Sequence, residues 1–107
     1  MRNNAYVYFM ANKNNTVIYI GITSDLMRRV WEHKNDMCKN SFTKKYKCHK
    51  LVYFEHSSSI QAAIAREKQL KNWKRLWKND LIEEQNPEWV DLSSEFYEIA
   101  GQARNDG

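Results

Sequence analysis

Two strand-forming segments lie close together near the start of the chain, and this pair limits the possible folds more than any other feature. Residues 5–10 and 16–22 are rich in β-branched and aromatic residues, which favour β-strands. The polar stretch Ala-Asn-Lys-Asn-Asn between them readily forms a turn. We therefore predict an antiparallel hairpin, around which the remaining elements have to pack.

A helix is predicted directly after the hairpin, from Leu26 to about Met37. The Thr-Ser-Asp sequence at residues 23–25 offers capping side chains, and the segment that follows has few β-branched residues. Four side chains share one face of this helix by their spacing: Leu26, Val30, His33 and Met37. A titratable imidazole on this stripe is expected to be partly buried.

A third strand is predicted over residues 49–55, after a basic connection at 39–47. Its centre, residues 51–54, is continuously apolar, which is typical of a strand covered on both faces. With the hairpin it makes a small three-stranded antiparallel sheet flanked by helices. The predicted fold class is therefore α+β.

Two more helices are predicted after the third strand. Ser58 and Gln61 have the spacing of a capping box, which begins a helix that runs to about Trp73. A further helix continues through about Ile82. Pro87 marks its stop, because proline restricts the residue before it to extended geometry.

The length of 107 residues suits a single domain. We expect this domain over residues 1–91, followed by an acidic to polar C-terminal tail over 92–107. No apolar run approaches the ~20 residues of a membrane helix, and the first residues lack the apolar stretch of a signal peptide. Two cysteines are too few for a secreted disulfide framework, so a cytoplasmic protein without a membrane partner is expected.

Charge is divided unevenly along the chain. The formal net charge is +4, but residues 1–78 hold 16 Lys or Arg and 5 Asp or Glu, which gives +11. Residues 79–107 hold 1 basic and 8 acidic side chains, which gives −7. A basic body of this kind favours a polyanionic partner, and we expect the acidic tail to pack near it.

Tyrosines gather on the two hairpin strands. Tyr6 and Tyr8 lie on one face of their strand by alternation, and Tyr19 and Gly21 lie on the second strand. A glycine near a strand end allows another group to approach the backbone closely. Tyrosines on strands are also common in ordinary cross-strand packing, which is the alternative interpretation.

Arg29 and His33 lie four residues apart on the predicted first helix and so share a face. A guanidinium holds phosphate well, and an imidazole can transfer a proton near neutral pH. The alternative is a solvated helix surface on which these residues are simply charged or polar.

Glu67 falls on a predicted apolar stripe of a later helix. Ile60, Ala63 and Ile64 define this stripe, and its next position is 67. A buried carboxylate without a partner is strongly disfavoured, so Glu67 is expected to pair with a cation, accept hydrogen bonds or hold a metal. An ion pair with a basic side chain is the simpler alternative.

Basic and aromatic side chains are interleaved in two parts of the chain. Cationic side chains contact phosphates and aromatic rings stack on unpaired bases, so this pattern is typical of nucleic-acid binding. The residues predicted to bind nucleic acid are Lys44, Lys45, Tyr46, Lys47, Lys71, Lys74 and Arg75. For Trp73 and Trp77, a place in the core is the alternative to stacking on bases. The cysteines and histidines of the chain lack the spacing of a zinc site.

Taken together, these residues resemble the GIY-YIG nuclease superfamily over roughly residues 5–90. The matches occur in the family's order: Tyr6-Val7-Tyr8, Tyr19-Ile20-Gly21, Arg29, His33 and Glu67. The first tripeptide departs from the family pattern, because Tyr6 stands where the family has glycine. The compact length and the ending Asn86-Pro87-Glu88-Trp89 are similar to the small stand-alone bacterial branch.

The resemblance implies hydrolysis of DNA phosphodiester bonds by a divalent-metal-dependent endonuclease, with DNA repair or recombination as the natural setting. The implied roles are Tyr8 as general base, Tyr19 to orient water or phosphate, Arg29 to stabilise negative charge, His33 to assist proton transfer and Glu67 to hold the metal. A phenol is a poor base at neutral pH, so this mechanism requires Arg29 or the metal to lower the pKa of Tyr8. We expect these residues to meet on one face of the sheet.

The resemblance also implies a cofactor and supporting residues. One divalent cation is expected, Mg²⁺ first and Mn²⁺ as the alternative. Gly21 and Asn86 are expected to support the active site, with Asn72 and Asn79 as alternatives to Asn86. The expected partner is DNA, with RNA left open. The competing hypothesis is a nucleic-acid-binding module of the same fold that does not cleave.

Overall fold

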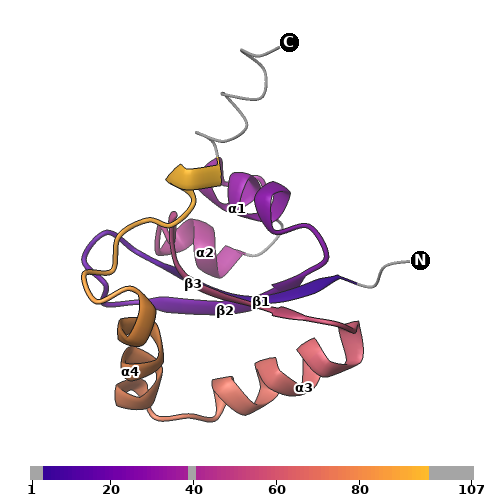
Figure 1. The fold of residues 1–107 in the computed structure, drawn as a ribbon. Helices are drawn as coiled ribbons and strands as arrows, with labels where there is room; N and C mark the ends of the chain where they lie inside the picture. The colour runs from indigo at the N-terminus through magenta and orange to yellow at the C-terminus, as the bar shows by residue number, and fades with distance from the viewer. Residues whose placement is uncertain (1–3, 39–40, 97–107) are drawn as a thin grey trace.

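A computed structural model describes residues 4–38 and 41–96 and has the predicted α+β architecture. Three antiparallel strands form one sheet in the order β2-β1-β3, flanked by helices. In chain order the elements are β1 (Ala5–Ala11), β2 (Ile18–Thr23), α1 (Leu26–Lys34), α2 (Ser41–Lys45), β3 (Lys50–Ser57), α3 (Ile60–Lys71) and α4 (Arg75–Gln85) (Figure 1). Among the described residues, no helix is long and apolar enough to span a bilayer.

The hairpin between β1 and β2 is closed by Asn12. Its side-chain Oδ1 accepts hydrogen bonds from the backbone amides of Thr16 at 2.9 Å and Val17 at 3.0 Å. Asn15 adopts a left-handed conformation with φ of 59°, which asparagine tolerates better than most residues. The asparagines of this loop therefore explain the tight connection that the sequence predicts.

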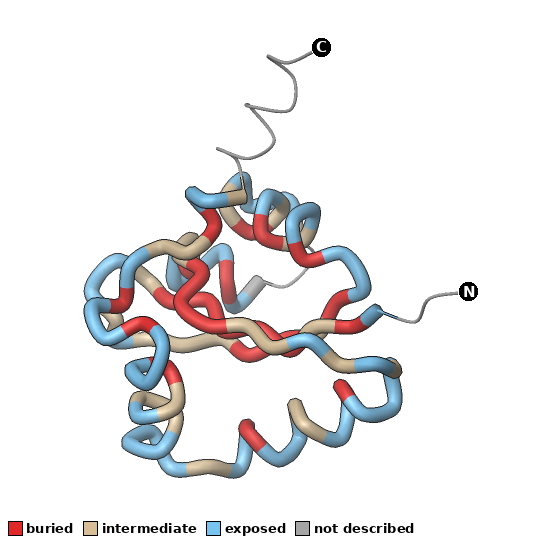
Figure 2. Tube along the Cα trace, in the orientation of Figure 1, coloured by how far each residue is buried: buried red, intermediate tan, exposed pale blue. Residues whose placement is uncertain are grey.

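Helices cover both faces of the sheet. In Figure 1, α1 and α2 lie on one side and α3 and α4 on the other, and Figure 2 shows the buried residues concentrated along the sheet between them. Alternation divides the central strand accordingly: Tyr8 and Met10 pack on the α1 side, whereas Val7 and Phe9 pack on the α3 side. In β3, Leu51 packs on the α1 side and Val52 on the α3 side, so the prediction of a third strand covered on both faces is confirmed.

The first helix is shorter than predicted. It ends at Lys34, because the Asn35 side chain donates to the Trp31 carbonyl at 2.8 Å and Asp36 takes a left-handed φ of 54°. Leu26, Val30 and His33 are buried, but Met37 is 64% exposed. The prediction that Met37 continues the buried stripe is therefore wrong.

The basic connection after α1 contains a helix that the sequence analysis missed. Residues Ser41–Lys45 form α2, and the next strand extends to Ser57. A bulge interrupts the pairing of β1 with β3, since Phe9 pairs with Tyr53 and Met10 with Leu51. Val52 and Tyr53 consequently both belong to the core on the α3 side.

The face of α3 that packs on the sheet also differs from the prediction. Ser59 rather than Ser58 caps the helix, accepting a hydrogen bond from the Ala62 amide at 3.1 Å. Ile60 and Ile64 are 42% and 37% exposed, so the predicted stripe through them is wrong. Ala63 and Leu70 are the buried residues of this helix, and they define a stripe that passes through position 67.

Asn86 fastens the end of α4 to the sheet. Its Nδ2 donates to the carbonyls of Val52 at 3.0 Å and Val90 at 2.9 Å, and its Oδ1 accepts from the Val90 amide. Asn86 is buried, so these bonds are shielded from water. Because its partners are backbone groups beside β3, the structure gives Asn86 a structural contact and not one with the predicted catalytic residues.

The segment after α4 crosses the β3 edge to the α1 side of the sheet. The Leu92 amide donates to the Leu51 carbonyl at 2.8 Å, and the Asp91 carboxylate pairs with Lys34 of α1. Leu92 and Phe96 then pack against the core on that side. Residues 92–96 of the predicted tail thus lie against the domain, and 97–107 fall outside the described residues.

Replacing Asn86 should destabilise the fold. Asn86→Ala removes three hydrogen bonds and leaves buried backbone groups without partners, which lowers the free energy of unfolding by about 2–3 kcal/mol. Asn79→Ala is the matched control, because Asn79 accepts one exposed hydrogen bond from Arg75, and we expect a loss below about 1 kcal/mol. Urea denaturation measures both, and equal losses would contradict the structural role of Asn86.

Candidate active site

Tyr8 lies at the centre of the site. It sits in the middle of the central strand and is fully buried on the face that α1 covers. Its hydroxyl lies 2.8 Å from Nε2 of His33, which α1 presents to the sheet together with Leu26 and Val30. The packing of α1 therefore brings together two titratable groups that are 25 residues apart in sequence.

His33 is a buried, neutral imidazole. It is 2% exposed, and its Nδ1 lies 3.2 Å from Oγ1 of Thr43, a buried residue of α2. Burial, reinforced by the positive charge of Arg29, lowers the pKa of His33 to about 4. At neutral pH the ring therefore has one nitrogen that donates a proton and one that accepts.

The hydrogen-bond partners of Tyr8 and His33 determine where the phenol proton and the imidazole proton lie. Burial raises the pKa of Tyr8, and the charge and hydrogen bonding of Arg29 only partly oppose it, so the phenol is protonated at neutral pH. A guanidinium has donors only, so the phenol proton points to His33 Nε2, and His33 Nδ1–H donates to Thr43. The lowered pKa that the sequence analysis required of Tyr8 is not produced by the protein's own residues.

Tyr19 and Phe42 extend this cluster toward the surface. The half-buried Tyr19 ring lies 5.4 Å from the His33 ring and 6.2 Å from the Tyr8 ring, between centroids. Phe42 of α2 lies 6.2 Å from Tyr19, between ring centroids. The rings of Tyr8 and Tyr19 thus lie beside the imidazole, and Phe42 lies next to Tyr19.

Gly21 makes room for the Tyr8 ring. It is the residue directly opposite Tyr8 in the hairpin. A Cβ at this position would lie 2.6 Å from the Tyr8 hydroxyl oxygen and 2.9 Å from Cε2 of Tyr19, closer than atoms can pack. The requirement for glycine is therefore steric: only a residue without a side chain fits beneath the phenol.

Arg29 carries the positive charge at the mouth of the site. Its Nε pairs with Glu32 Oε1 at 3.1 Å, and its side chain is 40% exposed. Burial opposes the charge on Arg29, but attraction to Tyr8, Cys38 and Glu32 outweighs this and raises its pKa further. The guanidinium is thus held in place and still accessible to an anion.

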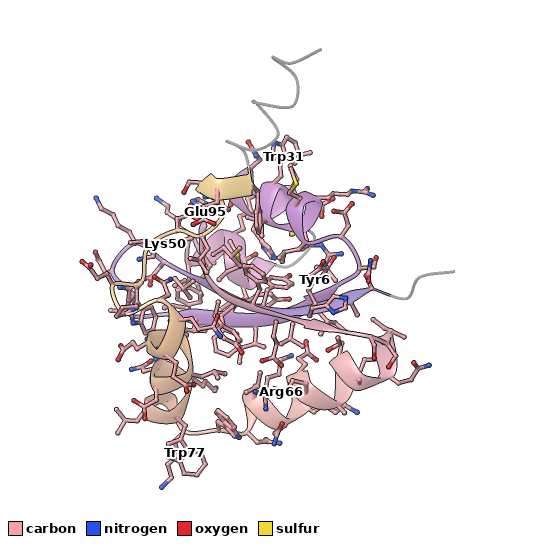
Figure 3. The ribbon with its side chains drawn as sticks, in the orientation of Figure 1. Tyr6, Trp31, Lys50, Arg66, Trp77 and Glu95 are labelled. Carbon is pink, nitrogen blue, oxygen red and sulfur yellow. The ribbon has the colours of Figure 1, made fainter. Side chains whose placement is uncertain are left out.

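Glu67 lies on the opposite side of the sheet from Tyr8, Tyr19, Arg29 and His33. It belongs to α3, whose neighbouring Arg66 lies below the sheet in Figure 3 and pairs with Glu55 of β3 at 2.7 Å. The Glu67 side chain is 18% exposed and lies 3.4 Å from Nζ of Lys71. The expectation of one shared sheet face holds for Tyr8, Tyr19, Arg29 and His33 but is wrong for Glu67.

The edge of β2 connects the two layers. A pocket of about 340 Å³ at this edge is lined by Tyr19 and Phe42 from the α1 side and by Lys71 from the α3 side. Because Lys71 is also the ion-pair partner of Glu67, the carboxylate lies close to the same edge. The ion pair that the sequence analysis offered as the alternative for Glu67 is present.

The acidic and histidine side chains limit how a metal can bind. Among the described residues, no group of three or more His, Cys, Asp or Glu side chains is arranged to hold an ion. Mg²⁺ commonly uses one or two carboxylates and completes its shell with waters and substrate phosphates. A single half-buried carboxylate such as Glu67 fits a site of that kind.

The predicted nucleic-acid-binding residues divide into two groups. Lys44, Lys45, Tyr46 and Lys47 are exposed on and after α2, and Lys71 is exposed at the β2 edge. Arg75 instead donates to the backbone carbonyls of Thr16 and Asn15 in the hairpin loop, at 3.1 and 2.5 Å, which is a structural role. Lys74 is the N-cap residue that precedes α4, with its Nζ 5.6 Å from the centre of the Trp77 ring.

Residues 4–80 match the GIY-YIG catalytic domain. The chain belongs to the GIY-YIG family. A UPF0213 protein of Syntrophus aciditrophicus (strain SB) is 35% identical over 83 residues, which make up 78% of this chain and 93% of that protein. The solution NMR structure of a UPF0213 protein from Bacillus halodurans has the same fold, with a TM-score of 0.50 at 24% identity over 80% of this chain and 89% of that one. GIY-YIG domains form a nuclease superfamily, so the substrate class is nucleic acid.

Two residues of this GIY-YIG site were not anticipated from the sequence. Thr43 and Phe42 contact His33 and Tyr19 from α2, a helix within the stretch interpreted as a connection. A five-residue helix is too short for its periodicity to be recognised. The sequence signal for this helix was one apolar residue, Phe42, between polar neighbours. That pattern did not indicate a contact with His33.

Adding one methyl group at Gly21 should disturb the GIY-YIG core. Gly21→Ala places its Cβ against the Tyr8 phenol, and overpacking of this kind destabilises a fold by about 1–3 kcal/mol. Ser24→Ala, in the exposed loop that follows, serves as the control and should stay within about 0.5 kcal/mol. Thermal unfolding of both variants is the measurement, and an unchanged Gly21→Ala protein would show that the phenol has room to move.

Stability should fall as the pH drops from about 6.5 to 4, because of His33. Its pKa is about 4 in the folded protein and ordinarily 6.5, so the unfolded chain binds the proton more tightly in this window. Above pH 6.5 His33 is neutral in both states, and no stability is lost. Below about pH 4 the lost free energy of unfolding amounts to about 3 kcal/mol. Urea denaturation across this range should show a shallower slope for His33→Gln than for wild type. His56→Gln, which removes an exposed histidine, is the matched control. Equal slopes in all three proteins would refute this linkage.

Proposed function

We propose that this protein is a divalent-metal-dependent endonuclease that hydrolyses phosphodiester bonds in DNA. The observation that carries the proposal is the hydrogen bond of 2.8 Å between Tyr8 and the neutral His33, next to the accessible cation of Arg29. This arrangement combines a proton acceptor with a phosphate-binding charge. Membership of a nuclease superfamily supports the same reaction class.

Tyr8 and His33 act as a proton-transfer pair in this proposal. The resting phenol is protonated, so it cannot take a proton from water unless it gives up its own. His33 Nε2 is positioned to accept the phenol proton, while Tyr8 accepts one from the attacking water. Thr43, at the other ring nitrogen, accepts from Nδ1–H and so stabilises the imidazolium that forms.

Substrate binding prepares His33 to accept that proton. The positive charge of Arg29 contributes to the low pKa of His33 in the free protein. An anionic phosphate bound by Arg29 offsets this charge and raises the pKa of His33 toward its ordinary value. The pair is therefore expected to become basic only when the phosphodiester is bound.

Arg29 and Glu67 serve the phosphate. The guanidinium of Arg29, fixed by Glu32, stabilises the negative charge that develops on the phosphate oxygens. Glu67 would hold one divalent cation, Mg²⁺ or Mn²⁺. When bound, this cation supplies charge neutralisation at the phosphate and the leaving oxygen. Tyr19, between the buried pair and the β2 edge, orients the water or the phosphate.

The distribution of charge supports a DNA substrate. All five proposed site residues lie within residues 1–78, which carry the charge excess of +11. The exposed lysines of α2 extend the positive surface away from Arg29. An activity on DNA would suit repair or recombination.

Plasmid nicking with and without Mg²⁺ tests the proposal. We expect wild type to nick only with the metal, and Arg29→Ala to lower the rate by about 100-fold or more. Glu67→Ala should abolish the metal-dependent signal. Arg28→Ala and Glu84→Ala are matched controls, since both side chains are exposed, and they should keep the wild-type rate within about twofold.

Two results would count against the proposal. Metal-dependent nicking that persists in Glu67→Ala would point to a contaminating nuclease and remove the metal assignment. Wild-type protein that binds DNA and does not nick it under any metal would instead establish a non-cleaving nucleic-acid-binding module.

A further inference from the structure

A hollow of about 580 Å³ lies at one end of the sheet, away from the Tyr8–His33 pair. It forms where the loop between β1 and β2 meets the end of α1, the start of β3 and the segment after α4. Its polar lining includes Lys13, Lys34, Tyr46, Lys47, Lys50 and Asp91. Figure 3 labels Lys50 in this region.

We propose that this lysine-lined hollow binds a second phosphate of the substrate strand, a few nucleotides from the phosphodiester held by Arg29. The inference rests on the proposed function and adds a second contact to it.

The hollow carries an excess of positive charge. Four lysines face one carboxylate, Asp91, and that carboxylate is already occupied. It pairs with Lys34 and accepts hydrogen bonds from the Ser93 hydroxyl at 2.7 Å and the Leu51 amide at 3.2 Å. The charges of the other three lysines therefore remain for an anion.

Lys50 is fixed within the hollow without being neutralised. Its Nζ donates to the side-chain oxygen of Asn15 at 2.5 Å, and Asn15 is an uncharged amide. An ammonium group held by a neutral acceptor keeps its charge and has further donors for a phosphate oxygen. Because Lys50 is half-buried, its charge is also less screened than that of a fully exposed lysine.

Lys47 occupies an unfavourable backbone position at the rim. Its φ is 54°, in the left-handed region that glycine and asparagine tolerate and that other residues adopt only at an energetic cost. Within residues 4–38 and 41–96, its side chain has no carboxylate partner. A strained residue with an unpaired positive charge, beside a hollow of the same sign, indicates a role in binding rather than in folding.

The hollow and the proposed catalytic pair lie along the same side of the molecule. Lys34, which lines the hollow, directly follows His33 in α1. Along β1 the hollow begins at Ala11, three residues or about 10 Å beyond Tyr8. That distance corresponds to about three nucleotides of one DNA strand. Aromatic contacts connect the two places, since Phe42 lies 6.2 Å from Tyr19 and 4.8 Å from Tyr46, which lines the hollow.

The decisive variant is Lys47→Gly, because it separates binding from folding. Glycine relieves the left-handed conformation, so the thermal midpoint should stay unchanged or rise. The affinity for a fluorescein-labelled duplex of about 12 base pairs, measured by anisotropy without metal, should fall about fivefold to tenfold at low salt. The slope of log K against log salt should become smaller by about 0.9, the value for one phosphate contact.

Lys68→Ala is the matched control, since it removes one exposed positive charge from α3, away from the hollow. We expect it to lower the affinity by less than twofold and to leave the salt slope within about 0.3 of wild type. Lys13→Ala, a second change in the hollow, should reproduce the effect of Lys47→Gly. Equal behaviour of Lys47→Gly, Lys13→Ala and Lys68→Ala would overturn the proposal.

Failure of this inference can be told from failure of the proposed function. If wild type nicks DNA and the hollow variants bind it as the control does, only the second phosphate site is wrong. If wild type neither nicks nor binds the duplex, both are wrong. Titration with inorganic phosphate distinguishes the source of the anion. Protection of wild type against unfolding by millimolar phosphate, without an effect of Lys47→Gly on duplex binding, would make the hollow a small-anion site and overturn its assignment to the substrate strand.

Discussion

The hydrogen bond between Tyr8 and His33 is the interaction on which the rest of the site depends. It exists because β1 is the central strand and α1 packs its Leu26, Val30 and His33 face against that strand. Gly21 must be without a side chain for the phenol to lie where it does. Thr43 then fixes the far side of the imidazole from α2. Residues from β1, β2, α1 and α2 thus together position the buried hydrogen bond between Tyr8 and His33.

Burial gives this contact its chemical character. The same desolvation keeps the phenol protonated and the imidazole neutral, so neither residue alone is a ready base or acid at neutral pH. Arg29 adds a positive charge that lowers the pKa of both groups. An arriving phosphate reduces the effect of that charge. In the proposed mechanism, the pair becomes basic only once an anion is bound at Arg29.

The two helical layers are connected by contacts around the edges of a narrow sheet. In the order β2-β1-β3, the strands β2 and β3 form the two edges of the sheet, and contacts pass around both. At β2, the pocket lined by Tyr19 and Lys71 joins the buried pair to the layer that carries Glu67. At β3, Asn86 and the Asp91–Lys34 ion pair fasten the segment after α4 across the edge. Contacts around both edges thereby connect the two layers of this small domain.

Local periodicity determined much of this protein from the sequence alone. Alternation on β1 and β2 and the four-residue step from Arg29 to His33 are short-range patterns, so they predicted the hairpin and the shared helix face of Arg29 and His33. The expectation that Tyr8 and Tyr19 meet these two residues on one face of the sheet came from the resemblance to the GIY-YIG family. The tertiary structure alone decided that Ala63 and Leu70, not Ile60 and Ile64, face the sheet, that Thr43 completes the imidazole contacts, and that Asn86 bonds to Val52. These features join residues that are distant in sequence or depend on how a helix rotates against its neighbours. Such contacts leave no period in the chain, because their energy is set by packing between elements and not within one.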